Sequence, residues 1–512
     1  MFLSVAAAAG FLPCPPSSPG GLHPGARSTL ESPDHRALDG TLPPDNGPPP
    51  TDEHVAAKNF VLRLPHGTIR YRATAGTLTL SDQGYQSASV FYTAYTTRPS
   101  AHHPRPITFA FNGGPWVSSM WLRAGSFGPA RVRTPQPGET GGSAAVLAPN
   151  PATLLTRSDL VVIDAPVTGL SRPVASDGAN LVGVDCDVDV FARFIRRYLT
   201  KYHRTMAPVF IMGESYGTFR AAILSRVLTA VRPRIALRGV ILIGTFLNRD
   251  DIREVPGAER YYVNFLPSYA AAAWYHGKVT GKPSLGSWLD RATRFAEGPY
   301  ASALRSYDTL TPAQIDAVSE RISYFTGLPA PLVKSAKLRV GAGAFRAAIG
   351  HDGLILGRID ARYIGATSGD PADLATAPAF LAANNEQIFS QLKYRTPVSF
   401  WPINGETALE WTPTHLTPAG STEYLPNAAD DLIAAMKSDP RLRVISLNGV
   451  YDLATPFRGA EHDLAKVTSD PALGRRVSIE RFEAGHMVYA DEAAFPTVTR
   501  RLKRFYREAL GH

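Results

Sequence analysis

The stretch that most constrains the fold is a glycine-flanked serine between an apolar run and a helical pattern. Residues 209–212 form a short apolar run of strand type, Gly213-Glu-Ser-Tyr-Gly217 follows, and a helical pattern begins at once. This order predicts a sharp strand-to-helix turn that lifts Ser215 above the edge of a sheet. Glycine is expected at both ends of the turn because a Cβ there would collide with the neighbouring strand or helix. The new helix directs free N–H groups at whatever lies over Ser215. The plain alternative is an ordinary glycine-rich turn.

Strand and helix patterns on both sides of this turn predict the fold class. Alternation with period two predicts antiparallel strands at 59–64, 67–72, 76–80 and 87–95. Buried strands are predicted at 106–111, 159–164, 237–244, 442–447 and 477–482, and helices at 184–203 and 492–510. Strands that alternate with helices predict an α/β fold with a mostly parallel central sheet flanked by helices. From 253 to 396 the alternation stops and helical patterns prevail, which predicts an inserted helical cap.

These patterns divide the 512-residue chain into four parts. Residues 1–57 are read as a leader or disordered segment, 58–252 as the first part of the core, 253–396 as the cap and 397–512 as the second part of the core. The hydrophobic fraction of 44% and the charged fraction of 19% are typical of a globular protein. No apolar run is long enough for a transmembrane helix, so none is predicted.

The first 57 residues are rich in Pro, Gly and Ser and lack periodicity. Val5-Ala-Ala-Ala-Ala9 resembles the core of a secretory signal, although no Lys or Arg precedes it. A secreted or periplasmic location is therefore predicted, with a cytoplasmic location as the alternative. The two cysteines, Cys14 and Cys186, are too few for a disulfide framework, and Cys186 is expected to be a structural thiol. The net charge is +9, but Lys and Arg are scattered, so nucleic-acid binding is not predicted.

The chemistry that this turn implies requires two further side chains. A serine hydroxyl needs a general base, and the base needs a third group to orient it. In the α/β-hydrolase fold the chain order is Ser, acid, His, with both partners in loops after late strands. Asp452 follows the strand predicted at 442–447, and His486 follows the one predicted at 477–482. The order predicts a triad of Ser215, Asp452 and His486. The alternatives are a turn residue for Asp452 and an ordinary loop histidine for His486.

The tetrahedral intermediate of such a reaction needs N–H donors for its oxyanion. One donor comes from the residue after the nucleophile, Tyr216. The other is expected from a glycine-rich loop after an early strand, and Phe111-Asn-Gly-Gly-Pro115 has that position. The alternative for this loop is a plain Gly-Gly turn.

The combined motifs resemble the serine carboxypeptidase family, in particular its bacterial branch, within the α/β-hydrolase superfamily. The motifs that carry the resemblance are Asn112-Gly-Gly-Pro115 with Ser118-Ser119, Gly125-Ser-Phe-Gly-Pro129, Asp164-Ala-Pro166 with Gly169-Leu-Ser171, Gly213-Glu-Ser-Tyr-Gly217, Asn448-Gly-Val-Tyr-Asp452 and Ala484-Gly-His-Met487. It spans roughly residues 58–510. It implies a hydrolase core under a helical cap and release of single residues from peptide C-termini. It also implies that Gly114 and Tyr216 supply the oxyanion N–H groups, and that Asn112, Gly113 and Glu214 bind the terminal carboxylate of a peptide substrate.

Two departures from the family pattern affect the substrate site. Trp116 stands where the family usually has glycine, and its indole would narrow the cleft or restrict the loop. Ser126 stands where family members have a second carboxyl, so the site loses one negative neighbour. This loss predicts a less acidic working pH or a changed leaving group. Arg123, Arg172 and Arg220 are further candidate carboxylate ligands, although surface or structural roles are expected for them.

The sequence therefore predicts a serine carboxypeptidase that acts through an acyl-enzyme and needs no metal or cofactor. An acyltransferase or esterase on the same scaffold stays open, because an alcohol or amine can intercept an acyl-enzyme instead of water. A catalytically silent binding protein is the alternative from another class. Side-chain preference is expected to come from the cap, where no motif is matched.

Overall fold

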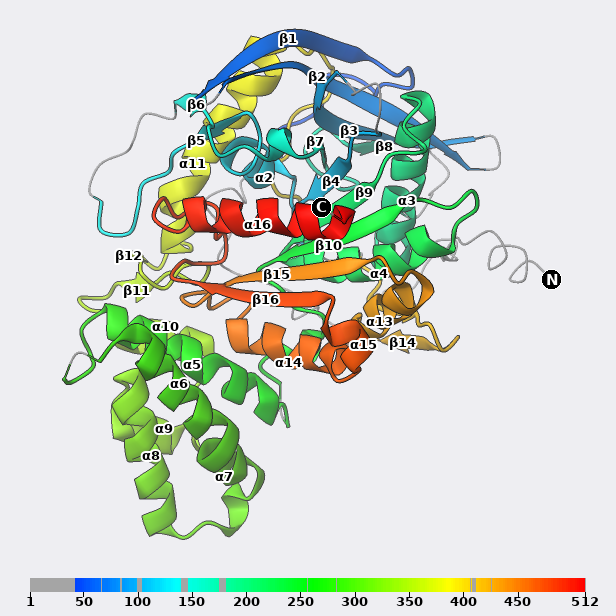
Figure 1. The fold of residues 1–512 in the computed structure, drawn as a ribbon. Coiled ribbons are helices and arrows are strands. Elements are labelled where there is room, and N and C mark those ends of the chain that lie inside the picture. The colour runs from blue at the N-terminus through cyan, green and yellow to red at the C-terminus, as the bar shows by residue number, and fades with distance from the viewer. Residues whose placement is uncertain are drawn as a thin grey trace.

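The computed structural model describes residues 42–511, apart from 66, 83–84, 99–103, 140–145, 175–180, 256, 282, 406, 408–410 and 425. The signal-like stretch and most of the predicted leader lie outside the described residues. A single large sheet runs through the core, with helices on both faces and a helical lobe at one end (Figure 1).

The central sheet has the order β1-β2-β3-β7-β4-β9-β10-β15-β16, with β8 paired to β3. Its strands are β1 (Val55–Leu64), β2 (Gly67–Asp82), β3 (Tyr85–Thr97), β4 (Ile107–Phe111), β7 (Asp159–Ile163), β8 (Arg172–Pro173), β9 (Val209–Glu214), β10 (Leu237–Ile243), β15 (Arg443–Gly449) and β16 (Val477–Phe482). The strands from β1 to β3 and the β3–β7 pair are antiparallel, and the row from β7 to β16 is parallel. The prediction of a mostly parallel sheet with an antiparallel start is confirmed. Small two-stranded sheets are formed by β5 (Ala130–Val132) with β6 (Leu147–Pro149), β11 (Ile355–Leu356) with β12 (Ile364–Gly365), and β13 (Thr414–Leu416) with β14 (Thr422–Tyr424).

The sequence predicted an interruption between two strands of this sheet that the structure does not contain. The strands expected at 67–72 and 76–80 form one long strand, β2. Ala73 and Ala75 are buried and pair with Tyr95 and Thr93 of β3, so the ladder continues through the supposed turn. Pairing with a long neighbour overrides the weak strand preference of alanine and glycine.

Two layers of helices cover the sheet because its side chains alternate between two cores. One core takes Phe109, Phe111 and Leu242, and the other takes Ala110 and Ile243. The first lies under α3 (Val184–Lys201), α4 (Tyr216–Ala230), α13 (Ala429–Ser438) and α14 (Phe457–Thr468), and the second under α2 (Met120–Gly125), α11 (Pro371–Asn385) and α16 (Phe495–Leu510). In Figure 1 α16 lies across the sheet, close to the β10 and β15 strands. Short helices η2 (Leu154–Thr156), η3 (Arg249–Asp251) and α15 (Pro471–Gly474) lie in the connections.

The inserted segment is helical, as predicted, and most of it forms the lobe at the bottom of Figure 1. Its helices are α5 (Glu259–Tyr275), α6 (Leu285–Phe295), η4 (Ala296–Tyr300), α7 (Ala301–Arg305), η5 (Tyr307–Thr309), α8 (Pro312–Thr326), α9 (Ala330–Ser335), α10 (Ala342–Ile349), α11 and η6 (Glu386–Gln391). A third hydrophobic cluster fills the lobe and includes Tyr451 and Leu453 of the core. The cap is therefore packed against the loop that follows β15.

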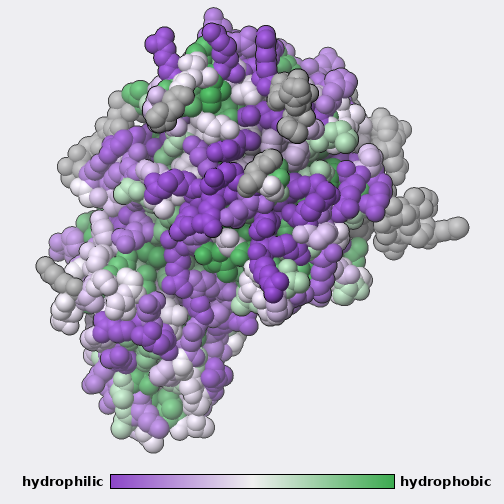
Figure 2. All heavy atoms as spheres, in the orientation of Figure 1, coloured by the Kyte–Doolittle hydropathy of each residue, from purple (hydrophilic) through white to green (hydrophobic). Residues whose placement is uncertain are grey.

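Hydrophilic side chains cover most of the face in Figure 2, with small, interrupted hydrophobic areas between them. Among the described residues, no helix combines the length and hydropathy that crossing a membrane requires. Cys186 in α3 is buried and disulfide-bonded, so the expectation of a structural thiol is wrong.

A buried ion cluster ties the chain that leaves the cap to the core. His415 of β13 is fully buried, with Nδ1 against Asp185 and Nε2 3.1 Å from Asp431 Oδ2. Asp431 also pairs with Arg226. Burial lowers the pKa of His415. The hydrogen bonds and charges of the two aspartates raise it by more, so that the pKa is about 9.

Stability is therefore expected to fall as the pH rises from neutral to alkaline. Because the folded pKa of His415 lies above its unfolded value, the stabilisation that protonated His415 gives to the fold is complete below about pH 6.5. It is lost as the pH rises through about 9. The shift corresponds to about 3 kcal/mol of unfolding free energy. Denaturant unfolding at several pH values should show this loss in the wild type and not in His415→Gln, whose stability is already lower. The exposed His351 gives the control, and a His351→Gln variant should keep the wild-type pH dependence. Equal pH dependence in His415→Gln and wild type would contradict the prediction.

Candidate active site

Five neighbouring parallel strands carry their following loops to one edge of the sheet. These strands are β4, β9, β10, β15 and β16, and they lie side by side in that order. The predicted oxyanion loop follows β4, Ser215 follows β9, Asp452 follows β15 and His486 follows β16. Parallel neighbours end at the same edge, so segments about 370 residues apart in the chain meet there.

Ser215 lies on a strained turn between β9 and α4. Its backbone has φ 58° and ψ −128°, a conformation that residues with a side chain rarely adopt. The strain is held by close packing on both sides. A Cβ on Gly213 would lie 1.9 Å from the carbonyl oxygen of Gly217, and a Cβ on Gly217 would lie 2.9 Å from that of Phe111. Both glycines are therefore required, for the reason that the sequence suggested.

Hydrogen bonds to the Ser215 backbone hold the turn in place and leave the serine side chain accessible. The Ser215 N–H donates to Ile243 O at 2.9 Å, and Ser215 O accepts from the Thr218 N–H and hydroxyl at 2.8 and 2.7 Å. Ser215 is partly exposed, whereas its neighbours Glu214 and Tyr216 are buried.

Asp452 and His486 form a short, buried pair. Asp452 Oδ2 lies 2.6 Å from His486 Nδ1. The Asp452 side chain is fully buried and the His486 side chain almost fully. The other oxygen, Oδ1, accepts the N–H groups of Ala454 and Thr455 at 2.7 and 3.0 Å. The Thr455 hydroxyl donates to Asp452 Oδ2 at 2.7 Å. The carboxylate is therefore held in one orientation, with Oδ2 facing the imidazole. Sequence reasoning missed Thr455, which belongs to no motif and is identified only by its contacts.

Gly244 brings the imidazole next to the serine turn. This residue directly follows β10 and has φ +58°. A Cβ at this position would lie 2.7 Å from His486 Cε1 and 2.8 Å from Nδ1, so only glycine leaves room for the ring. Since Ile243 accepts the Ser215 N–H, the imidazole and the serine backbone lie against adjacent residues, Gly244 and Ile243. No hydrogen bond joins the Ser215 hydroxyl to His486 among the described residues. Catalytic hydrogen bonds are often long until substrate binds.

Electrostatics favour a cationic His486. Burial lowers its pKa, but the charge and hydrogen bond of Asp452 and the charge of Glu214 outweigh burial and raise the pKa above its usual value. A histidine that is stabilised as a cation can accept a proton from a nearby hydroxyl.

The two segments that the sequence predicted to form an oxyanion site pack against each other. Tyr216 is the first residue of α4, so its N–H has no partner within the helix. Gly113 packs directly against it, since a Cβ on Gly113 would lie 2.4 Å from Tyr216 N. Gly114 has φ +107° and is exposed beside these buried residues. The buried Arg220 holds this loop through Asn112 O at 2.7 Å and is itself paired with Asp187 at 2.6 Å.

Glu214 and Asn112 form a buried polar pair beside the turn. Asn112 Nδ2 donates to Glu214 Oε1 at 2.8 Å, and Asn112 Oδ1 accepts the Leu122 N–H at 3.1 Å. The Tyr489 hydroxyl lies near the same carboxyl, outside strict hydrogen-bond geometry. Burial raises the pKa of Glu214 to about 7, against the opposing effects of His486, Tyr489 and Asn112.

The two residues that depart from the family pattern are both buried. Trp116 is 8% exposed and belongs to the second hydrophobic core. The Ser126 hydroxyl donates to Leu122 O and so closes the end of α2. The three candidate arginines are engaged in ion pairs, Arg123 with Asp164 at 2.6 Å, Arg172 with Asp45 at 2.9 Å and Arg220 with Asp187. These contacts account for the arginines as structural residues. Among the described residues, no three His, Cys, Asp or Glu side chains are grouped to hold a metal ion.

A comparison with known families agrees with this geometry. The family model for serine carboxypeptidases matches residues 65–269, which include the oxyanion loop and the Ser215 turn. This part of the chain is similar to the serine carboxypeptidase family. Asp452 and His486 lie beyond the matched segment. No curated protein matches the chain.

Solved structures with a similar fold are only distantly related in sequence. VinJ is 14% identical with a TM-score of 0.36, over 85% of this chain and 98% of that one. A proline iminopeptidase from Mycobacterium smegmatis is 11% identical with a TM-score of 0.35, over 89% and 99%. A soluble variant of monoglyceride lipase from Saccharomyces cerevisiae is 11% identical with a TM-score of 0.36, over 90% and 99%. The fold assignment rests on the sheet order and strand directions, which are those of an α/β-hydrolase. Together with the serine carboxypeptidase match, this fold supports a serine hydrolase.

Proposed function

We propose that the protein is a serine carboxypeptidase that releases C-terminal residues from peptides. The observation that carries the proposal is the 2.6 Å pair of Asp452 and His486, at the sheet edge where Ser215 stands on its strained turn. In this mechanism His486 takes the proton of Ser215 while Asp452 orients the imidazole. The serine attacks the last peptide bond, and the N–H groups of Gly114 and Tyr216 stabilise the oxyanion. The released residue leaves, and water hydrolyses the acyl-enzyme.

The terminal carboxylate of the substrate is assigned to Asn112, Gly113 and Glu214. A neutral Glu214 can donate a hydrogen bond to a carboxylate, whereas an ionised one repels it. Trp116 and Ser126 are proposed to shape this end of the cleft.

The reaction class is tested by mass spectrometry of a peptide mixture after incubation with the protein. Wild type should produce ladders shortened only from the C-terminus, and Ser215→Ala should produce none. Internal cleavage, or the same ladders with both proteins, would contradict the proposal. Failure of Ser215 to react with a fluorophosphonate would favour a catalytically silent binding protein.

An acyltransferase or esterase is the second candidate, favoured by the two departures at Trp116 and Ser126. Blocked dipeptides and small esters, each with and without an added amine, separate the two activities. Faster turnover of esters than of peptides, with transfer to the amine, would favour it. Export to the periplasm or the medium stays a prediction, since the segment that suggested it lies outside the described residues.

The pKa of Glu214 leads to a specific pH dependence for free C-termini. Below about pH 7 its carboxyl is neutral and can donate to the substrate carboxylate, and above that pH it is an anion. The kcat/KM for a peptide acid, divided by that for the matching peptide amide, is expected to fall about tenfold from pH 6 to pH 8. The amide substrate cancels the titration of His486, because both substrates need the same base.

A Glu214→Gln variant should lose this dependence, because its amide is neutral at every pH. The working optimum of the wild type on peptide acids is expected near neutral pH. A sharp optimum near about pH 4–5, where an unperturbed glutamate titrates, would contradict this assignment. A flat acid-to-amide ratio in the wild type would contradict it as well.

A further inference from the structure

A short segment of the cap contacts both loops of the candidate acid–base pair. This bridge segment, residues 358–362, connects β11 and β12. Arg358 O accepts the Leu453 N–H at 2.9 Å, and the Ala361 N–H donates to Tyr451 O at 2.9 Å. Ile359 O accepts the N–H of His486 itself at 2.7 Å. The cap is thus hydrogen-bonded to the residue on each side of Asp452 and to the histidine.

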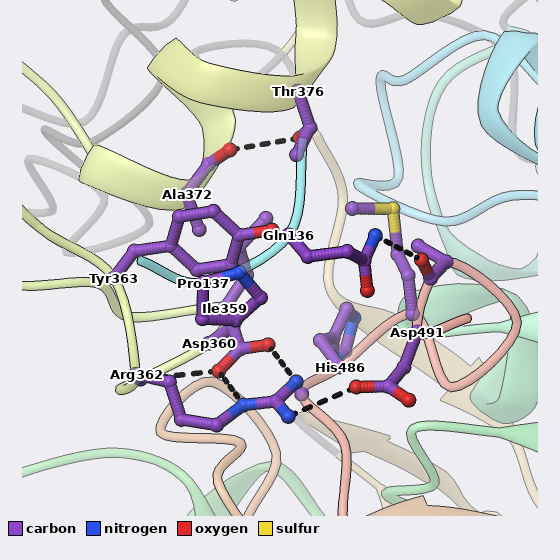
Figure 3. Close-up of a pocket in the computed structure, with 13 residues that line it drawn as sticks. Gln136, Pro137, Ile359, Asp360, Arg362, Tyr363, Ala372, Thr376, His486 and Asp491 are labelled. Carbon is purple, nitrogen blue, oxygen red and sulfur yellow. Dashed lines mark hydrogen bonds and ion pairs between the residues drawn. The ribbon is translucent and has the colours of Figure 1, made fainter. Parts of the chain in front are cut away.

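One guanidinium in the bridge segment joins the two loops through its side chain. Arg362 binds both oxygens of Asp360, at 2.9 and 2.6 Å, and Asp491 Oδ2 at 2.9 Å (Figure 3). It also donates to Glu483 O at 3.3 Å and lies 4.8 Å from the centre of the Tyr451 ring. Glu483 and Asp491 flank His486, and Tyr451 precedes Asp452. The same side chain therefore contacts the histidine loop on both sides and the aspartate loop on one.

The bridge segment packs closely against the loop that carries His486. The Arg362 and Asp491 side chains are 10% and 7% exposed. A Cβ on Gly485 would lie 2.5 Å from Asp360 Cβ, so the residue before the histidine lies directly against the bridge segment. The cavity between them, which His486 also lines (Figure 3), has about 20 Å³ of free space, roughly enough for one water molecule.

Besides the side-chain contacts of Asp452 and Thr455 with His486, the described part of the core joins these two loops through few backbone hydrogen bonds. Beyond the strands β15 and β16, Val450 donates to Phe482 O at 3.0 Å and Tyr451 to Ala484 O at 3.1 Å. Neither bond reaches past Ala484 to the histidine. The bridge segment supplies the contacts on the far side.

We propose that Arg362 is a positioning residue that aligns His486 with Asp452, so that the cap sets the geometry of the acid–base pair. This inference rests on the proposed catalytic role of that pair. A displaced imidazole would lower the rate of the chemical step without weakening substrate binding, because small displacements of a catalytic group reduce rate strongly. An arginine that only stabilises the cap would change thermal stability and leave turnover intact.

The variants are Arg362→Gln, Arg362→Lys and Asp491→Asn. Lysine can keep one ion pair but not the fork that binds Asp360 and Asp491 together. Asp491→Asn keeps the shape and removes only the charge on the core side. The matched control is Arg339→Gln in the cap, because Arg339 also pairs with a carboxylate, Glu259, at 2.7 Å, donates to Leu304 O and lies 5.5 Å from the Tyr307 ring.

Turnover of a p-nitrophenyl ester and of a blocked dipeptide is measured per active site, with the sites counted by end-point fluorophosphonate labelling. In Arg362→Gln and Asp491→Asn, kcat should fall about 10- to 100-fold, with KM changed less than about twofold. Arg362→Lys should be intermediate, and Arg339→Gln should keep the wild-type kcat whatever its thermal stability.

Wild-type kcat per labelled site in Arg362→Gln, with a lower melting temperature, would overturn the inference. If that variant does not fold, Asp491→Asn decides, and unchanged turnover there would overturn it. A wild type that neither labels nor turns over either substrate would instead overturn the proposed function, and with it this inference.

Discussion

Replacing Ser215 with alanine is expected to lower kcat for peptide hydrolysis about 10⁶-fold, the loss seen when a serine nucleophile is removed from an intact triad. Ser215 is the only proposed group that forms a covalent bond with substrate, so no neighbour can replace its hydroxyl. Product peptides should still bind with the wild-type Kd, because the proposed carboxylate site at Asn112 and Glu214 is unchanged.

The measurement is single-turnover hydrolysis of a blocked dipeptide together with fluorophosphonate labelling. Ser225→Ala is a matched control in the same helix, because the Ser225 hydroxyl is buried away from the site and donates to Ala222 O. The control should keep labelling and turnover. A Ser215→Ala protein that retains even 1% of wild-type kcat, roughly 10⁴-fold more than expected, would show that another residue is the nucleophile.

Replacing Asp452 with asparagine is expected to lower kcat about 10⁴-fold, because the imidazole would be held in the wrong tautomer. Oδ1 accepts two backbone N–H groups, so the asparagine oxygen should take that place. Its amide NH₂ would then face His486 Nδ1 as a donor. The ring proton moves to Nε2, and that nitrogen can no longer accept the proton of Ser215. The pKa of His486 should also fall, because it loses the charge that now raises it.

Steady-state kinetics give the rate, and NMR of the histidine ring gives the tautomer and the direction of the pKa change. Asp470→Asn is the control, since Asp470 also accepts an N–H two residues ahead, Ala472 at 2.9 Å, but lies at a surface helix. It should keep wild-type kcat. An Asp452→Asn protein with less than a tenfold loss would show that Asp452 does not orient the base.

The fold was largely predictable because its patterns are local. The period-two strands, the buried apolar strands and the helix after Gly217 each follow from residues close together in the chain, and the observed fold contains them. The joined strand β2 is an exception for the same reason. Ala73 and Ala75 have little strand preference of their own, and only pairing with β3 determines their conformation.

Ser215, Asp452 and His486 could be nominated from the sequence because chain order and position after a strand are properties of the sequence. The residues that hold these three side chains in place could not be predicted from the sequence. Thr455 and Gly244 belong to no motif, and each acts through a contact whose existence depends on the register of distant strands. The burial that raises the pKa of Glu214 is likewise invisible in a sequence.

The sequence by itself determined that a serine would stand on a strained turn at the edge of a parallel sheet, because an apolar run, a glycine pair and a helical pattern are adjacent in the chain. Only the tertiary structure decided that a cap arginine would lie between the loops of Asp452 and His486. Tyr451 and Asp491 lie about 90 and 130 residues after Arg362 in the chain. Their meeting depends on how the cap packs on the sheet, which no local pattern encodes.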